Sequence, residues 1–132
     1  MLPIALKSDR VPSWFRPALV AVLATLLVAC ASPQLRYSQL VVLNKGMAPA
    51  QTIAVLQQPP ITVQVVEQAG KAYTFHRYQL YNGLYSDVYL LCFEQGKLKY
   101  WGYVEEFRRY PDPAINQAVE LALDKIIDSE TR

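Results

Sequence analysis

Histidine, cysteine and glycine are scarce in this chain. Its 132 residues contain one histidine, His76, and two cysteines, Cys30 and Cys92. A conventional zinc site needs three or four protein ligands, and one histidine without a cysteine cluster does not supply them. No glycine-rich loop precedes a predicted helix, so the usual cradle for nucleotide phosphates is missing. We therefore expect no metal and no other cofactor.

An excess of charge of one sign is also lacking. The formal net charge is +2, and three of the 13 basic residues and one of the 11 acidic residues precede residue 18. Ten of each remain from residue 30 onward, so that part of the chain is neutral. Binding to nucleic acid needs clustered Lys and Arg to neutralise phosphates. We therefore expect no nucleic-acid partner.

Groups that could act together as acid and base do not converge in the sequence. His76 lies beside Arg77 in a predicted strand, where it is either a general base or a solvent-facing or packed strand residue. Glu105 and Glu106 are adjacent on another predicted strand, so we expect them on opposite faces and not paired with Asp87. We predict that the protein is not an enzyme.

A hydrophobic run long enough to cross a membrane is missing as well. Residues 18–29 are uncharged, and a helix of that length rises about 18 Å against a hydrocarbon core of about 30 Å. The run fits the apolar region of a signal peptide, and Lys7, Arg10 and Arg16 precede it. The stretch before the run is long for such a signal, so Val11 is an alternative start.

Cys30 follows the apolar run directly, which leaves three alternatives: a buried thiol, a disulfide with Cys92, or the first residue of the mature protein. Leu27-Val28-Ala29-Cys30 resembles the lipobox of bacterial lipoproteins. The resemblance implies a signal peptide over 1–29, cleavage between Ala29 and Cys30, and acylation of Cys30, with palmitate as one of the acyl groups. Several acyl chains on one residue make a permanent membrane anchor.

The residue after Cys30 bears on localisation. An Asp there would imply retention in the inner membrane, and this chain has Ala31. By analogy with enteric bacteria, we expect an outer-membrane lipoprotein that faces the periplasm, with the inner membrane as the alternative. With Cys30 acylated, Cys92 has no partner within the chain, and we expect its thiol to be buried on an apolar strand face.

The mature chain is predicted to form one small α+β domain over 46–132, after a segment over 30–45 with the lipidated Cys, a tether and a first short element. Alternating apolar residues and turn signals predict an antiparallel meander of three to four strands over 61–67, 72–81, 84–94 and 97–107. Asn82-Gly83 favours a type I′ hairpin turn.

Helices are predicted on either side of the meander. Pro49 favours the start of a short helix that continues over 50–57, and Leu35 to Leu43 suits either a strand or a short helix. Asp112-Pro113 and apolar residues at helical spacing predict a helix over 113–128 that packs on the sheet. The expected architecture has two layers.

Two motifs resemble a known family. Gly46-Met47, the helix AQTIAVLQ and Pro59 resemble the pattern G-M-x-x-x-x-V-x-x-x-L-G-x-P of the small outer-membrane lipoproteins called SmpA/OmlA or BamE-like. FEQGKLKYW resembles that family's F-x-x-G-K-L-x-x-W. Thr52 and Gln57 depart from the pattern, and the helix over 113–128 is not part of it. The resemblance implies a two-layer α/β fold and a non-enzymatic role beside the β-barrel assembly machinery.

Aromatic residues are concentrated between Tyr73 and Tyr110. Tyr and Trp suit protein interfaces because one end is apolar and the other forms hydrogen bonds. The candidate partner-binding residues are Trp101, Tyr103 and Phe107, and the alternative is that these rings form cross-strand ladders and core. We predict a membrane-anchored scaffold or adaptor that binds another envelope protein, or alternatively a small inhibitor or ligand-binding lipoprotein.

Overall fold

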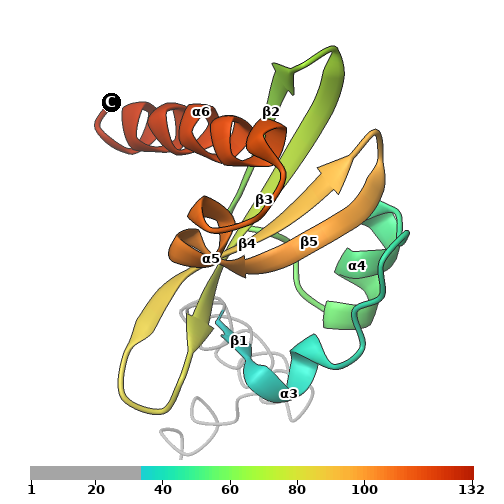
Figure 1. The fold of residues 1–132 in the computed structure, drawn as a ribbon. Coiled ribbons are helices and arrows are strands. Elements are labelled where there is room, and N and C mark those ends of the chain that lie inside the picture. The colour runs from blue at the N-terminus through green and yellow to red at the C-terminus, as the bar shows by residue number, and fades with distance from the viewer. Residues whose placement is uncertain (1–33) are drawn as a thin grey trace, which may run out of the picture. The chain divides into compact units, whose positions relative to one another are not determined.

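The computed structural model describes residues 34–132. The predictions for the signal peptide, the cleavage between Ala29 and Cys30, and the acylation of Cys30 concern residues outside this range. The elements in chain order are β1 (Leu35–Arg36), α3 (Tyr37–Leu40), α4 (Pro49–Leu56), β2 (Thr62–Gln68), β3 (Lys71–Tyr81), β4 (Ser86–Glu94), β5 (Lys97–Tyr103), α5 (Val104–Arg108) and α6 (Pro113–Glu130) (Figure 1).

The fold is α+β and is built on a meander of four antiparallel strands, β2 to β5, as predicted. The long strand β3 pairs with β4 on one side. On its other side it pairs with β2 over residues 71–77 and with β1 at Leu80 and Tyr81. β1 runs parallel to β3, so the sheet is mixed, which the predicted meander did not include.

The hairpin turns explain the register of the strands. Ala69-Gly70 and Gln95-Gly96 are two-residue turns with positive φ at both central positions, which type I′ turns require. The β3–β4 connection is different, because Tyr81 pairs with Ser86 and leaves a four-residue loop. The prediction of a turn at Asn82-Gly83 is confirmed, but its assignment as type I′ is wrong, because Gly83 has positive φ and Asn82 does not. The Asn82 side chain instead accepts hydrogen bonds from the amides of Leu84 and Tyr85 within the loop.

Helices pack against both faces of the sheet. Alternation along β4 sends Leu90 and Cys92 to one face and Leu91 and Phe93 to the other, as is typical of a central strand. The first face packs against α5 and α6 through a cluster that comprises Val66, Tyr73, Phe75, Leu90, Cys92, Phe107, Ile115, Ala118, Val119 and Ala122.

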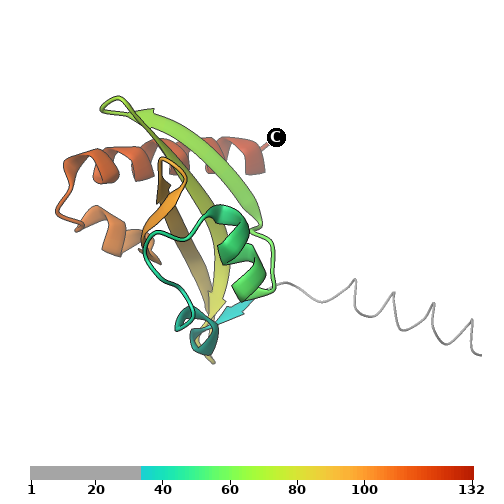
Figure 2. The same ribbon diagram turned by 90° about the vertical axis from the view of Figure 1, so that its right-hand side faces the viewer.

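The second face packs against the N-terminal segment. Its cluster comprises Leu35, Leu43, Leu56, Tyr78, Leu80, Tyr89, Leu91, Phe93 and Leu98. The structure therefore adds a layer to the two that the sequence predicted, since α4 and α6 lie on opposite sides of the sheet (Figure 2). Leu35 and Leu43 are part of this core, so the folded domain begins before residue 46, the start that the sequence predicts.

The C-terminal helix forms where the sequence predicted it. Asp112 caps α6 by accepting a hydrogen bond from the Ala114 amide at 3.0 Å, and Pro113 occupies the first turn. Ile115, Val119 and Ile126 are buried along one side of the helix. Among the helices that the structure describes, none combines the length and the hydrophobicity needed to cross a membrane.

Candidate functional site

The three candidate partner-binding residues do not form one surface. Trp101 and Tyr103 lie two residues apart on β5, and both pack partly buried against the cluster on the α4 side of the sheet. The ring of Tyr103 meets that of Tyr89 edge to face at 5.2 Å, and the hydroxyls of Tyr103 and Tyr37 share a hydrogen bond. Both β5 side chains therefore contribute mainly to the core.

Phe107 lies on the opposite face and is completely buried, so its assignment to a partner-binding surface is wrong. Its ring packs edge to face against Phe75 at 5.9 Å and against Tyr100 at 4.9 Å. The reason is that β5 ends at Tyr103 and the chain continues as helix α5, so the alternation of a strand does not extend to position 107.

Most of the aromatic side chains support the alternative of core packing. Tyr73, Tyr78 and Tyr89 are buried, and burial is the main cause that raises the pKa of Tyr73 and Tyr78 to about 12. Tyr37 and Tyr85 are exposed. The aromatic residues that a partner could reach therefore lie near the β3–β4 loop and not along the face of β5.

His76 occupies a buried position, not a reactive one. Its side chain is on the face of the sheet that packs against α4, and its ring contacts that of Phe93 with centroids 4.7 Å apart. Its Nδ1 has no hydrogen-bond partner within residues 34–132, and burial lowers the pKa of His76 to about 4. The ring is therefore neutral at pH 7 and shielded from substrate-sized molecules.

Cys92 is a free thiol that is buried, as predicted, and it lies in the cluster that packs against α6. Burial is the main cause that raises the pKa of the Cys92 thiol to about 12. A nucleophilic cysteine needs the thiolate, whose formation this environment opposes. Cys92 therefore acts as a small apolar side chain.

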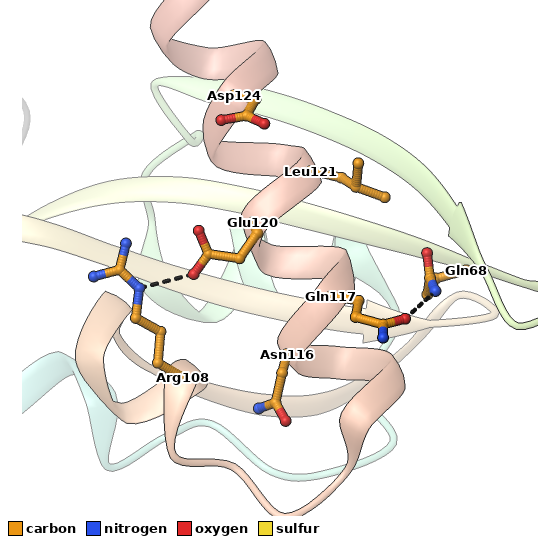
Figure 3. Close-up of a pocket in the computed structure, with 7 residues that line it drawn as sticks. All are labelled: Gln68, Arg108, Asn116, Gln117, Glu120, Leu121 and Asp124. Carbon is orange, nitrogen blue, oxygen red and sulfur yellow. Dashed lines mark hydrogen bonds and ion pairs between the residues drawn. The ribbon is translucent and has the colours of Figure 1, made fainter.

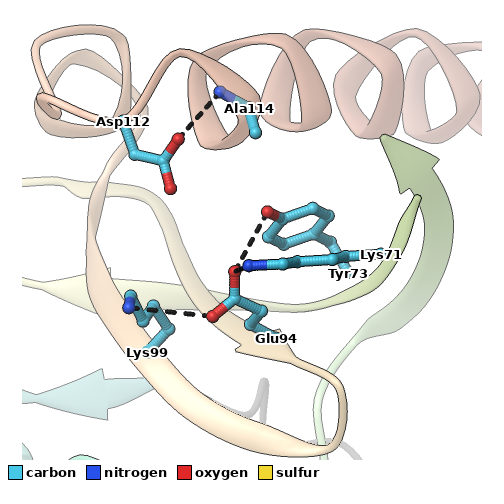
Figure 4. Close-up of polar contacts among 6 residues, drawn as sticks. All are labelled: Lys71, Tyr73, Glu94, Lys99, Asp112 and Ala114. Carbon is cyan, nitrogen blue, oxygen red and sulfur yellow. Dashed lines mark hydrogen bonds and ion pairs between the residues drawn. The ribbon is translucent and has the colours of Figure 1, made fainter. Parts of the chain in front are cut away.

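Glu94 is at the centre of the main polar network of the sheet (Figure 4). It accepts hydrogen bonds from Lys71 at 3.3 Å and from the Tyr73 hydroxyl at 3.1 Å, and Lys99 lies 3.7 Å away. Burial alone would raise the pKa of Glu94, but these hydrogen bonds and the two lysine charges outweigh it and hold the pKa below its usual value. The network links β3, β4 and β5 and leaves Glu94 fully engaged.

A shallow groove of about 540 Å³ runs along α6 (Figure 3). Four of its polar side chains bind one another in two pairs, because Arg108 donates to Glu120 at 2.8 Å and Gln68 donates to Gln117. Asn116 donates to two backbone carbonyls. The apolar contribution comes mainly from Leu121, which is exposed. Few polar groups in the groove therefore remain free to bind a small ligand.

Three carboxylates that we did not expect to converge line one hollow. Asp87, Glu105 and Glu106 surround about 350 Å³ together with tyrosine side chains. They come together because residues 104–108 are helical, so adjacent glutamates are not forced to opposite faces as they are in a strand. Glu105 is engaged by Arg108 at 2.6 Å.

An exposed apolar strip follows β2, and the sequence did not reveal it. The side chains of Ile61, Val63 and Val65 are exposed, with 48% of Val63 and 53% of Val65 accessible. Val63 pairs with His76, so the strip lies on the α4 side of the sheet. The alternation of the strand was visible in the sequence, but the sequence did not show that α4 leaves this end of the face uncovered.

No group of three or more His, Cys, Asp or Glu side chains within the described part of the chain is placed to hold a metal ion. No protein-family model matches the sequence, and comparisons with curated proteins and with solved structures found no match.

Proposed function

We propose that this chain is a non-enzymatic bacterial lipoprotein that is anchored in the outer membrane and acts as an adaptor for another envelope protein. The lipobox-like sequence before Cys30 supports the anchor. The buried positions of His76 and Cys92 support a role that does not depend on catalysis.

The observation that carries the binding role is the apolar strip of Ile61, Val63 and Val65. Val63 and Val65 lie on β2 at the edge of the sheet, and Ile61 immediately precedes this strand. Exposed edges of this kind are used for strand addition or side-chain docking by partners. Lys125 from α6 donates to the Val65 carbonyl at 3.2 Å, so this backbone group points away from β3. A lysine at the edge limits nonspecific pairing of strands.

The choice of partner to test first comes from the resemblance to SmpA/OmlA proteins. Gly46-Met47 and the FEQGKLKYW hairpin direct attention to the β-barrel assembly machinery. The left-handed backbone of Gln57, with φ of 56°, is at the position where that family pattern has Gly, so the departure in residue type keeps the backbone geometry that Gly favours.

Photo-crosslinking in cells tests the adaptor role. A photoreactive amino acid replaces Val63 in one strain and Ile127 in another, since Ile127 is an exposed apolar residue on α6. We expect position 63 to yield a discrete crosslinked protein, identified by mass spectrometry, and position 127 to yield none. A Val63→Lys variant should lose the complex on detergent extraction while keeping its fold. Uncrosslinked monomer from position 63 would refute the adaptor role.

A further inference from the structure

One end of the domain presents apolar and aromatic side chains to solvent. We call it the tip cluster, and it consists of Tyr37, Tyr81, Leu84 and Tyr85. Leu84 is 89% exposed and Tyr85 61% exposed. Leu84 lies in the four-residue loop between β3 and β4, which Figure 1 draws as the hairpin at the same end of the sheet as β1 and α3.

The tip cluster is held together by pairing and by the structure of the loop. Tyr81 pairs with Arg36 of β1, and its hydroxyl donates to the Gly83 carbonyl at 3.0 Å. The Asn82 side chain accepts from the amides of Leu84 and Tyr85 at 2.9 and 3.0 Å. The loop is therefore fixed with the Leu84 side chain outward.

Tyr37 joins this group from another part of the chain. It opens α3 immediately after β1, and it lines the same hollow as Asn82 and Tyr85. Val41 lies one helical turn after Tyr37, on the same side of α3, and is also exposed. The cluster thus combines a loop tip with the first residues of the folded domain.

The position of this cluster relative to the anchor is limited by covalent geometry. Five peptide units link Cys30 to Leu35, and an extended chain of that length spans at most about 18 Å. β1 enters the sheet beside Leu80, next to the β3–β4 loop. An acylated Cys30 would therefore keep this end of the domain near the bilayer.

We propose that the tip cluster is a second membrane contact, in which Leu84 and the tyrosines insert into the lipid headgroup region and orient the anchored domain. This inference rests on the acylation of Cys30 in the proposed function. Tyr side chains are enriched at membrane–water interfaces because their rings are apolar and their hydroxyls polar. The lipid anchor gives the tip cluster a high effective concentration at the bilayer, so a contact of a few side chains is enough to orient the domain.

Charge at this end selects the lipid surface. Asp87 and Glu106 line the hollow beside the cluster, and Glu105 there is paired with Arg108. Arg36 is the basic residue that adjoins the cluster through its pairing with Tyr81. Acidic groups near the contact are repelled by anionic lipid, so the occupant is a zwitterionic lipid surface.

A fluorescence experiment on the intact lipoprotein tests the contact. Leu84→Cys and Ile127→Cys variants are each labelled with nitrobenzoxadiazole and reconstituted through the acyl anchor into vesicles of phosphatidylcholine and phosphatidylethanolamine that contain nitroxide lipids. The native thiols do not interfere, since Cys92 is buried and an acylated Cys30 has no thiol. Figures 1 and 2 both draw α6, which carries position 127, away from the β3–β4 loop.

We expect a blue shift and nitroxide quenching at position 84, and neither at position 127. Tyr85→Asp should reduce the quenching at position 84 with the circular dichroism spectrum unchanged, and replacing half of the phosphatidylcholine by phosphatidylglycerol should reduce it too. Equal signals at the two positions, or stronger quenching on phosphatidylglycerol, would overturn the contact. Mass spectrometry separates the two proposals: acylated protein without quenching refutes the contact alone, whereas absence of acyl chains refutes both.

Discussion

At the scale of single residues, the buried imidazole of His76 gives the fold a pH dependence. Burial lowers the pKa of His76 from 6.5 to about 4, so between these values the unfolded chain binds a proton that the folded chain excludes. The contribution of the neutral ring is complete above pH 6.5 and is lost as the pH falls toward 4. Between pH 7.5 and pH 5 we expect a loss of about 2 kcal/mol in the free energy of unfolding.

Urea unfolding at the two pH values measures this loss. The matched variant is His76→Phe, whose ring keeps the contact with Phe93 but does not titrate. We expect the variant to lose less of its free energy of unfolding than the wild type as the pH falls. An identical loss in both proteins would show that His76 is not the responsible group.

Gln57 is a second residue that affects stability, and it does so through its backbone conformation. It ends α4 in the left-handed conformation, with φ of 56°, which costs most residues energy and Gly none. We expect Gln57→Gly to raise the free energy of unfolding by about 0.5–1 kcal/mol. The control is Ala54→Gly in the middle of the same helix, which should lower it by about 1 kcal/mol. Urea unfolding of both variants tests whether the free energy of unfolding changes in opposite directions.

At the scale of elements, helix α5 shows where sequence periodicity misleads. The run from Lys97 to Phe107 alternates like a strand, yet it becomes helical at Val104. Two acidic residues in the first turn and Arg108 in the last favour a helix, and these signals were present in the sequence. A Cβ at Gly102 would lie 2.1 Å from a carboxylate oxygen of Glu106, so a larger residue at this position would require the Glu106 side chain to shift. The misassignment of Phe107 followed from missing this helix.

The start of α6 is a feature that the sequence alone predicted. Asp112→Ala removes the acceptor for the Ala114 amide, and we expect it to lower the free energy of unfolding by about 1 kcal/mol. Asp112→Asn keeps a side-chain oxygen at the cap and should cost much less. Urea unfolding of the two variants distinguishes capping from loss of charge, since an equal effect would assign the role to charge.

At the scale of the whole molecule, the meander and α6 follow from local patterns, whereas the covering of the second face does not. The pairing of Leu35 with Leu80 joins residues far apart in the chain, and no local periodicity encodes it. The same limit applies to the candidate site. That Val63 and Val65 form a strand was predictable, but their exposure depends on where α4 packs.

The extent of the folded domain can be tested by truncation. A chain that begins at residue 46 lacks Leu35 and Leu43, which are buried in the core. Burial of two leucines contributes about 3–6 kcal/mol, comparable to the total stability of a small domain. We expect the chain 31–132 to unfold cooperatively with urea and the chain 46–132 to lack a cooperative transition. Equal stability of the two would place the start of the domain at residue 46.

Acylation of Cys30 is the claim on which the adaptor role and the membrane contact both depend. Metabolic labelling of cells with a palmitate analogue, followed by isolation of the protein, measures it directly. The account predicts a labelled mature protein that begins at Cys30 and fractionates with the outer membrane, and an unlabelled, uncleaved precursor for Cys30→Ala. Equal labelling of both proteins, or an unlabelled wild-type protein, would contradict it.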